Sequence, residues 1–312
     1  MHNTEIIKLK PCFKDYLWGG SKLKEKYNKH TDLEICAESW ELSAHPNGES
    51  VVDSGEFKDC VFSEYLNNNQ TAVGKKGEAF DFFPMLIKFI DAKDNLSIQV
   101  HPDDAYALEN HGEYGKTEMW YILDAEEDAS LYYGFTKKIS KEEFAERIKT
   151  NTLLEVLNSV KVKKGDVFFI EAGTVHAIGK GIVICEIQQN SNITYRVYDY
   201  DRRDAQGNAR ELHIDRAVEV SKTDVAVPYK SEKENILASC KYFTVERMNV
   251  CGKSSLNVNE ESFKSVIVAE GSLCISDEKQ NITAEKGDSI FIPAQNKSFT
   301  LEGECELVIS YL

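Results

Sequence analysis

The chain of 312 residues contains eight cysteines, but no two of them form a CxxC pair. Zinc clusters built from cysteine use such pairs, so the sequence argues against a cluster of that kind. The chain also has no apolar run of membrane-spanning length, and its N-terminus, MHNTEIIKLKPC, lacks the apolar segment of a secretory signal. We therefore expect a protein of the reducing cytoplasm with no membrane partner.

Positive charge is also scarce. Lys and Arg number 37 against 52 Asp and Glu, which gives a net charge of −15. Nucleic acids and anionic membranes bind basic surfaces, so neither is an expected partner. An anionic small molecule would need a local group of Lys and Arg side chains. The composition, with 42% hydrophobic and 29% charged residues, is typical of a soluble globular protein, and the length favours two domains.

Strand patterns dominate the chain. Segments rich in β-branched and aromatic residues are bounded by Gly, Asp, Asn or Pro, and they include FPMLIKFIDA, EMWYILDA, SLYYGF, DVFFIEAG and GIVICEIQQ. One clear helix is expected over 140–160, with Ser140 as its N-cap, and a second, shorter one after Pro102. Residues 225–235 are polar and contain a proline, which makes them the best candidate for a linker.

An internal repeat suggests two related halves. KKGDVFFIEAGTVHAI (163–178) is similar to EKGDSIFIPAQNKSFT (285–300), since each has Lys-Gly-Asp, an apolar strand and a turn with Ala. Two such copies indicate two related β-barrels. The first copy has His176 where the second has Ser298, and no histidine follows His213. The second half is therefore expected to lack a metal site.

The strand LSIQVH, which ends at Pro102, has an unusual polar face. Its apolar residues alternate with Ser97, Gln99 and His101. Residues two apart on a strand point to the same side, so Gln99 and His101 should both point into the barrel. A solvated face would more often carry Lys, Glu or Thr. Taken singly, a Gln or His on a strand is more often a satisfied polar group than a ligand.

The first copy of the repeat resembles the second motif of the cupin superfamily. That motif places a metal-binding His after two spaced glycines, which correspond here to Gly165, Gly173 and His176, with Glu171 in place of the usual Pro. Further segments extend the likeness: LWGG, AESWELSAHPNGES, LIKFIDAKDNLSIQVHPDD, GKTEMWYIL and GTVHAIGKGIVICEIQQNSNITYRVYDYDR. Together they resemble class I mannose-6-phosphate isomerases, in the short bacterial form, over nearly the whole chain.

The resemblance implies a fold and a domain organisation. The expected fold is mainly β, with two cupin-like jelly-roll β-barrel domains and a few short helices. A catalytic, metal-binding cupin domain is expected over 1–235, with a helical insertion near 140–160. A metal-free, cupin-like β-barrel domain is expected over 236–312, packed against the first, where it could close one side of the active cleft. The expected assembly is a monomer or a homodimer.

The resemblance also implies a set of metal ligands. In the family a Gln and a His two residues apart, a Glu after a Lys-x pair, and a distant His hold one metal ion per chain. These fall on Gln99, His101, Glu118 and His176. Two imidazoles, a carboxylate and an amide oxygen suit a borderline divalent ion. Zinc is the first choice, with cobalt or manganese as substitutes.

Other residues acquire expected roles in the same way. Lys88 and Ser97 match a Lys and a Ser that hold phosphate, and Arg202 matches a further basic residue at the substrate. For Arg202 and its neighbour Arg203, a solvated surface charge is an equally good interpretation. Asn192 stands where the family often has Asp, and an amide cannot take a proton from carbon at neutral pH.

The implied reaction interconverts mannose 6-phosphate and fructose 6-phosphate through a cis-enediol that the metal helps to stabilise. Arg196 matches a catalytic Arg and would stabilise the enediolate. Glu186 and Lys116 are both candidates for the base that moves a proton between C2 and C1. Two alternatives stay open: an iron-dependent cupin oxygenase, which the identity of the bound metal would distinguish, and a non-catalytic protein that binds sugar phosphates.

Overall fold

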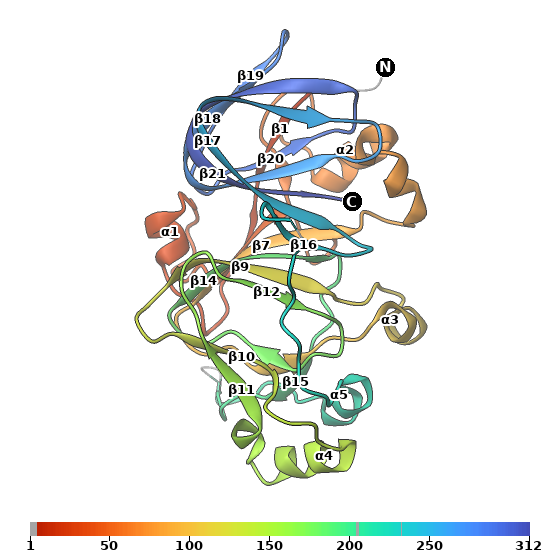
Figure 1. Ribbon diagram of the computed structural model, residues 1–312, viewed down its shortest axis with the longest axis vertical. Coiled ribbons are helices and arrows are strands. Elements are labelled where there is room, and N and C mark those ends of the chain that lie inside the picture. The colour runs from red at the N-terminus through yellow and green to blue at the C-terminus, as the bar shows by residue number, and fades with distance from the viewer. Residues whose placement is uncertain (1–4, 204–205, 232) are drawn as a thin grey trace.

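The computed structural model describes residues 5–203, 206–231 and 233–312. This part of the chain forms layers stacked along the long axis of the molecule (Figure 1). Helices cover one end, two facing sheets follow, and a curled sheet built mainly from the C-terminal residues forms the other end. None of the helices within the described ranges is both long enough and apolar enough to span a membrane.

The six-stranded sheet lies in the middle of the stack. Its residues alternate between two apolar clusters: Met119 and Tyr121 pack toward the C-terminal half, whereas Trp120 and Ile122 pack toward the five-stranded sheet. Both faces are therefore covered, and this explains why three of its strands are buried along their whole length. In order, its strands are β12 (Val167–Ile170), β9 (Glu118–Ala125), β14 (Ile182–Gln189), β7 (Met85–Ala92), β3 (Glu38–Leu42) and β2 (Cys12–Lys14).

The five-stranded sheet faces the six-stranded sheet on one side and the helices on the other. Ile98 and Val100 pack outward with Phe144 and Ala217, which lie in two of the covering helices. The polar residues between them therefore point inward. The strands are β11 (Leu157–Lys161), β10 (Ser130–Phe135), β13 (His176–Ala177), β8 (Ile98–Val100) and β15 (Tyr195–Tyr198).

The eight-stranded sheet combines the two ends of the chain. Ile7 in the first strand pairs with Phe291, and Leu9 pairs with Val52. The division expected at 235/236 stays a prediction, but the first strand of the chain lies in the sheet of the C-terminal half. In order, the strands are β16 (Ile236–Ser239), β17 (Thr244–Val258), β21 (Lys297–Tyr311), β18 (Lys264–Ser276), β20 (Ser289–Ile292), β1 (Ile7–Lys10) and β6 (Val51–Val52), and β19 (Asn281–Glu285) pairs with β18. A separate two-stranded hairpin is formed by β4 (Ala44–His45) and β5 (Gly48–Glu49).

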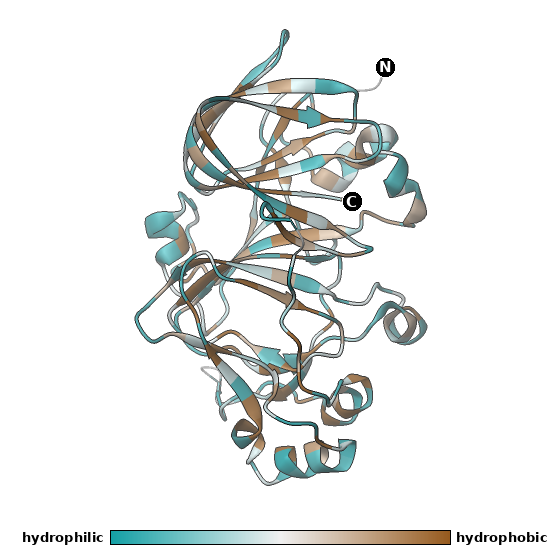
Figure 2. Ribbon diagram, in the orientation of Figure 1, coloured by the Kyte–Doolittle hydropathy of each residue, from teal (hydrophilic) through white to brown (hydrophobic). Residues whose placement is uncertain are grey.

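The mainly β, cupin-like fold is confirmed, with one difference from the expected barrels. In the part of the chain that the structure describes, the sheets are open and face one another instead of closing into cylinders. Apolar residues follow the strands of both halves, whereas the helices and the tip near β19 are more polar (Figure 2). The C-terminal sheet curls around its own apolar cluster, which includes Val266, Ile290 and Ile309.

The helix expected over 140–160 is shorter than predicted. Ser140 does cap α4 (Lys141–Lys149), because its hydroxyl accepts a hydrogen bond from the Glu143 N–H at 3.1 Å. The helix ends before Asn151, which takes a left-handed φ of +56°. A short 3-10 turn follows, and the last residues of the expected helix form β11 because Val160 pairs with Leu131 of β10.

The second expected helix is confirmed as α3 (Asp104–His111). It begins after Asp103, whose carboxylate accepts the Tyr106 N–H, and it ends at Gly112 with φ +67°. The remaining helices are α1 (Lys22–Lys26), α2 (Phe62–Asn68) and α5 (Ile214–Val220), with 3-10 turns at Gln70–Val73, Lys75–Ala79 and Leu153–Glu155. The expected linker over 225–235 contains no helix or strand among its described residues.

Candidate active site

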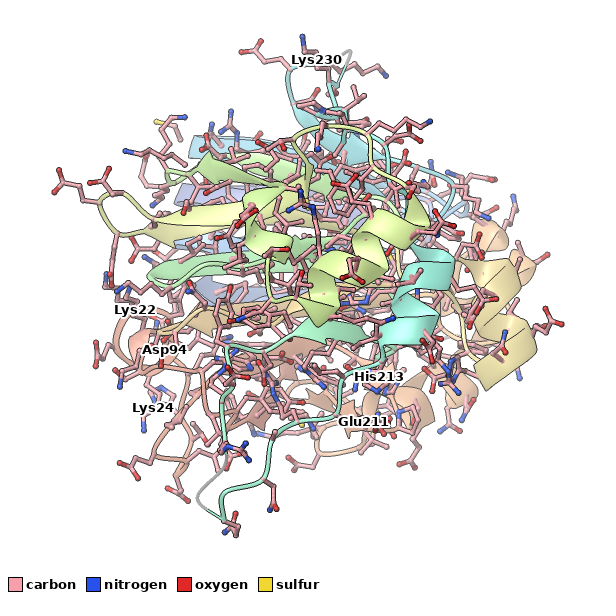
Figure 3. All side chains as sticks on the ribbon, turned by 90° about the horizontal axis from the view of Figure 1, so that it is seen from below. Lys22, Lys24, Asp94, Glu211, His213 and Lys230 are labelled. Carbon is pink, nitrogen blue, oxygen red and sulfur yellow. The ribbon has the colours of Figure 1, made fainter. Side chains whose placement is uncertain are left out.

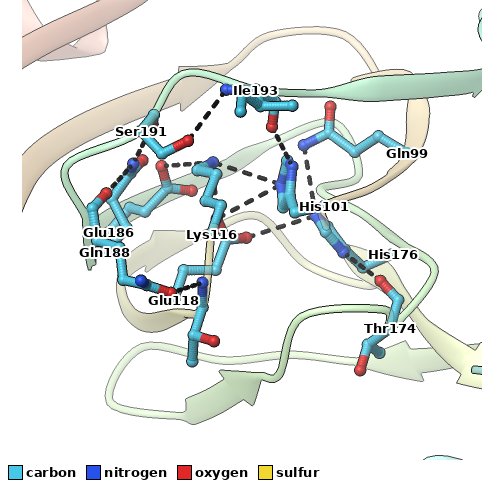
Figure 4. Close-up of polar contacts among 12 residues, drawn as sticks. Gln99, His101, Lys116, Glu118, Thr174, His176, Glu186, Gln188, Ser191 and Ile193 are labelled. Atoms are coloured by element: carbon cyan, nitrogen blue, oxygen red, sulfur yellow. Dashed lines mark hydrogen bonds and ion pairs between the residues drawn. The ribbon is translucent and has the colours of Figure 1, made fainter. Parts of the chain in front are cut away.

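The four expected metal ligands come together from two facing sheets (Figure 4). Gln99 on β8 pairs directly with His176 on β13, and His101 follows the end of β8. Glu118, the first residue of β9, approaches from the six-stranded sheet. It therefore lies across from the others, on the facing sheet and not on a strand adjacent to theirs. Ligand atoms of His101, Glu118 and His176 all lie within 4.8 Å of one another.

Backbone carbonyls fix the orientation of both imidazoles. His101 Nδ1 lies 2.8 Å from the Ile193 carbonyl oxygen, and His176 Nδ1 lies 2.8 Å from that of Thr174. A carbonyl only accepts, so each Nδ1 carries the proton and each Nε2 presents a lone pair. These Nε2 atoms lie 3.6 and 3.4 Å from the Glu118 carboxylate. A hydrogen bond from the ring nitrogen that does not face the metal to a backbone carbonyl is usual for metal-binding histidines.

The electrostatics favour neutral imidazoles. Burial, together with Lys116 and His176, holds the pKa of His101 well below its usual value. Burial also lowers the pKa of His176 to about 4. Burial and the nearby Glu186 raise the pKa of Glu118 to about 7, against the opposing effect of Lys116.

These residues fit a divalent metal ion. Among the described residues, neither oxygen of the fully buried Glu118 accepts a hydrogen bond of good geometry, although Lys116 Nζ lies 2.7 Å from Oε2. Two imidazole lone pairs also face this carboxylate. Acceptors that converge in a buried space repel one another unless a cation lies between them. The side-chain amide of Gln99, with Nε2 3.3 Å from His176 Nε2, can turn its oxygen toward the same point.

The two candidates for proton transfer are neighbours. Lys116 Nζ lies 3.5 Å from Glu186 Oε1, and the other Glu186 oxygen accepts the Trp120 indole N–H at 3.0 Å. Burial disfavours the Glu186 carboxylate, but Lys116 and Lys88 outweigh burial and lower its pKa. Burial likewise disfavours the Lys116 ammonium, but Glu118 and Glu186 raise its pKa overall.

Lys88 is held between two carboxylates. Its Nζ lies 3.6 Å from Glu38 and 3.9 Å from Glu186, and 4.5 Å from the centre of the Trp40 ring. Only 4% of the residue is exposed. Glu38, which also accepts the Trp40 indole N–H at 2.7 Å, was missed in the sequence. A charged residue two before a Trp, in a strand that is otherwise buried, was the available signal.

One cavity of about 310 Å³ connects most of the expected site residues. Its lining includes Asn192, where the family often has an acid, and Arg210, which was not anticipated. Arg210 lies in an irregular segment whose sequence gives no sign of its position. The expected residues that line the cavity are Lys88, Ser97, Gln99, Lys116, Glu186 and Arg196.

Arg202 does not line this cavity. It lies with Arg203 and Arg210 around a neighbouring cavity of about 190 Å³. Arg202 donates to the buried Asp199 at 2.6 Å, and Arg210 donates to the same carboxylate through two nitrogens at 2.7 and 2.6 Å. Arg210 lines both cavities, so it lies where they adjoin.

Arg196 reaches the cavity from β15. Its backbone N–H donates to His213 Nδ1 at 3.2 Å, and its guanidinium donates to the Glu211 carbonyl at 2.8 Å. Both partners lie on the segment leading into α5 (Figure 3). Among the described residues the Arg196 Nε is buried without a hydrogen-bond partner. Burial and the adjacent Arg210 lower the pKa of Arg196, so a negatively charged ligand would be favoured here.

The fold and the site together define a cupin-like protein whose described residues include one group that fits a metal ion. Residues 6–134 match the catalytic domain of type I phosphomannose isomerase, and residues 232–312 match the cupin domain of mannose-6-phosphate isomerase. The chain belongs to the type I phosphomannose isomerase family.

Full-length relatives support this assignment. The mannose-6-phosphate isomerase ManA of Bacillus subtilis is 39% identical over 99% of both chains, and the mannose-6-phosphate isomerase of Streptococcus mutans is 38% identical over 95% of this chain and 94% of its own. The crystal structure of the mannose 6-phosphate isomerase from Bacillus subtilis matches 98% of this chain and 99% of its own, with a TM-score of 0.90 and 37% identity.

Proposed function

We propose that this protein interconverts mannose 6-phosphate and fructose 6-phosphate. The observation that carries the proposal is that two residues lining the cavity with Glu186 and Arg196 also contact the buried, metal-fitting group: Lys116 Nζ lies 2.7 Å from Glu118, and the Gln99 amide lies 3.3 Å from His176. Membership of the family supports the same reaction. A phosphosugar is also the kind of anion that local cations can bind despite the net charge of −15.

The proposed metal is zinc, one ion per chain, held by Gln99, His101, Glu118 and His176. When bound, such an ion supplies Lewis acidity at the carbonyl and hydroxyl oxygens of the sugar. Cobalt or manganese would suit the same ligands. The protein's own groups then need only hold the sugar, move one proton and balance negative charge.

The proposed proton transfer between C2 and C1 is carried out by Glu186 and Lys116. The C2–H of the aldose is acidic because it lies next to a carbonyl, and its removal gives a cis-enediol after O1 is protonated. Return of a proton at C1, with loss of the O2 proton, gives the ketose. The separation of 3.5 Å between Lys116 and Glu186 allows a proton to pass between them. Arg196 would stabilise the enediolate through its unpartnered Nε.

The phosphate has two groups of candidate partners. Lys88 and Ser97 line the cavity, as expected from the sequence, but the nearest charged groups to Lys88 are carboxylates. Arg210 lies at the junction with the neighbouring cavity, which Arg202 lines, and Asp199 holds both guanidinium groups in place. We propose Lys88 and Ser97 as the phosphate clamp, with Arg202 at the rim of the substrate site.

Turnover is the direct test. Purified protein loaded with zinc and given mannose 6-phosphate should form fructose 6-phosphate, measured with a coupled enzymatic assay. In heavy water the product should carry some solvent deuterium at C1, since the base can exchange its proton. Absence of turnover at full zinc content would overturn the proposal. Oxygen consumption by an iron-loaded sample would favour the cupin oxygenase instead.

Location and assembly belong to the same proposal. All eight cysteines are free thiols in the structure, as suits an enzyme of the reducing cytoplasm. The proposed assembly is a monomer or a homodimer. Size-exclusion chromatography with light scattering distinguishes the two states.

A further inference from the structure

The C-terminal half contacts the segments that carry the site through the carboxylate of Asp104. This residue begins α3, three positions after His101. Its Oδ2 accepts the Tyr242 hydroxyl at 2.6 Å and lies 3.2 Å from Lys241 Nζ. Tyr242 and Lys241 both belong to the turn between β16 and β17, so the contact joins the two halves.

The other oxygen of this carboxylate holds the segment that carries Lys116 and leads into β9 at Glu118. It accepts the backbone N–H of Gly115 at 3.0 Å and the side-chain amide of Gln189 at 2.7 Å. The amide oxygen of Gln189 in turn accepts the backbone N–H of Thr117 at 2.8 Å. The backbone N–H groups of Gly115 and Thr117, on either side of Lys116, are therefore both held by the Asp104 carboxylate, the first directly and the second through Gln189.

The two segments are too close to tolerate a side chain at Gly115. A Cβ added there would lie 2.4 Å from the carbonyl carbon of Asp103 and 2.5 Å from the nitrogen of Asp104. The Lys116 N–H also donates to the Pro102 carbonyl at 3.0 Å. The segment after His101 and the segment before Glu118 therefore form one packed unit, with the Asp104 carboxylate at its outer edge.

We propose that Asp104 and Tyr242 are positioning residues of the isomerase. The Tyr242 hydroxyl fixes the carboxylate, and the carboxylate fixes the Lys116–Glu118 segment relative to His101. The site depends on this spacing because Lys116 Nζ lies 2.7 Å from Glu118 and 3.4 Å from His101. The C-terminal half thereby contributes to catalysis although it lines no part of the described cavity. This proposal rests on the proposed isomerase function.

The test uses the full-length, zinc-loaded enzyme with Tyr242→Phe, which removes only the hydroxyl. We expect kcat at saturating zinc to fall by about tenfold, because small misplacements of catalytic groups slow the chemistry. The zinc dissociation constant should rise by about threefold or more, as it does when groups that orient metal ligands are lost.

Tyr229→Phe is the matched control. Its hydroxyl accepts the Ser239 N–H at 3.1 Å, so this variant also loses one hydrogen bond of the C-terminal half, but no contact links it to Asp104. Both parameters should stay within about twofold of wild type, whatever the change in melting temperature. If Tyr242→Phe behaves like Tyr229→Phe, with lower stability and unchanged kcat and zinc affinity, its role is only structural and the proposal is overturned.

A double-mutant cycle tests the route through the carboxylate. In an Asp104→Asn background, Tyr242→Phe should have less than about half of its effect on log kcat, because the partner it orients has changed. Fully additive effects would overturn the proposal. The zinc measurements separate it from the proposed function: without isomerase activity in the wild type, a weaker zinc affinity in Tyr242→Phe would still support the positioning role, and an unchanged affinity would overturn it.

Discussion

The two halves of the molecule build the same turn around different interiors. Gly165 and Gly287 both take positive φ, +89° and +97°, and their N–H groups donate to Ile122 and Val268 at 2.9 and 2.8 Å. In each copy the Asp that follows the glycine accepts the backbone N–H three residues before it, at 2.9 and 2.8 Å. Each neighbouring strand has a bulge next to Ile122 or Val268. The scaffold is therefore the same in detail.

The residues that point inward are not the same. Counted from the shared turn, Glu118 corresponds to Lys264, which lies 3.4 Å from Glu246 instead of facing a metal group. Glu186 corresponds to Ile309, which is fully buried in an apolar cluster. One interior is packed with apolar side chains, and the other keeps polar groups around a cavity. The comparison shows that this fold forms without a metal-fitting site. In the first half, the polar residues of the site occupy positions that apolar core residues fill in the second half.

The largest effect is expected from placing a charge in the apolar interior. Ile309→Glu gives the second half the residue of the first, without the lysines that balance Glu186. An unpaired buried carboxylate should lower the stability by more than about 4 kcal/mol, measured by urea unfolding. Ile309→Met should cost less than about 1.5 kcal/mol. A Glu variant as stable as the Met variant would show that this interior is not closed.

The second-largest effect is expected from the reverse exchange, which places a residue of the second half in the first. His176→Ser gives the first half the residue of the second and removes one of four proposed ligands. Since a complete site binds zinc with roughly 10–16 kcal/mol, the loss should be about 3–4 kcal/mol, or at least about 100-fold in affinity. Competition with a chelator of known zinc affinity should show this loss. An unchanged affinity for one zinc per chain would mean that the second half, or another group, binds it.

Arg196→Ala tests the cation that faces the cavity. We expect kcat to fall by at least about 100-fold, or about 2.7 kcal/mol of barrier, while zinc content stays at one per chain. Arg147→Ala, which removes an arginine paired with Glu143 on α4, is the control and should retain normal turnover. Near-normal turnover of Arg196→Ala would remove enediolate stabilisation from the proposed mechanism.

The smallest effect is expected from Lys88→Ala. A phosphate clamp acts on ground state and transition state alike, so KM should rise by about tenfold with little change in kcat, or about 1.4 kcal/mol of binding. Arg202→Ala, measured in parallel, should raise KM less. A larger rise in KM for Arg202→Ala than for Lys88→Ala would indicate that the phosphate binds nearer the neighbouring cavity, away from Lys88 and its partner Glu38.

The sequence predicted best what periodicity and position along one strand determine. Gln99 and His101 follow from alternation on β8, and Gly165 with His176 from the repeated turn. Glu118 required the resemblance, because its place on the facing sheet depends on tertiary packing. Arg210 was missed because no local pattern indicates which side chains of distant segments reach a cavity, whereas the signal for Glu38, a charge two residues before Trp40, was overlooked. The helix over 140–160 was drawn too long because its final residues have helical spacing but pair with β10.

The pairing of Ile7 with Phe291 has a consequence for how the chain folds. During synthesis β1 is made long before β20, the strand that pairs with it along one edge. Until then β1 can pair only with the short β6 on its other edge, and an unpaired strand edge invites association between chains. Closing so long a loop is also slow, because its entropy is lost before the contacts form. We therefore expect the rate-limiting step of refolding to be the joining of the two ends of the chain.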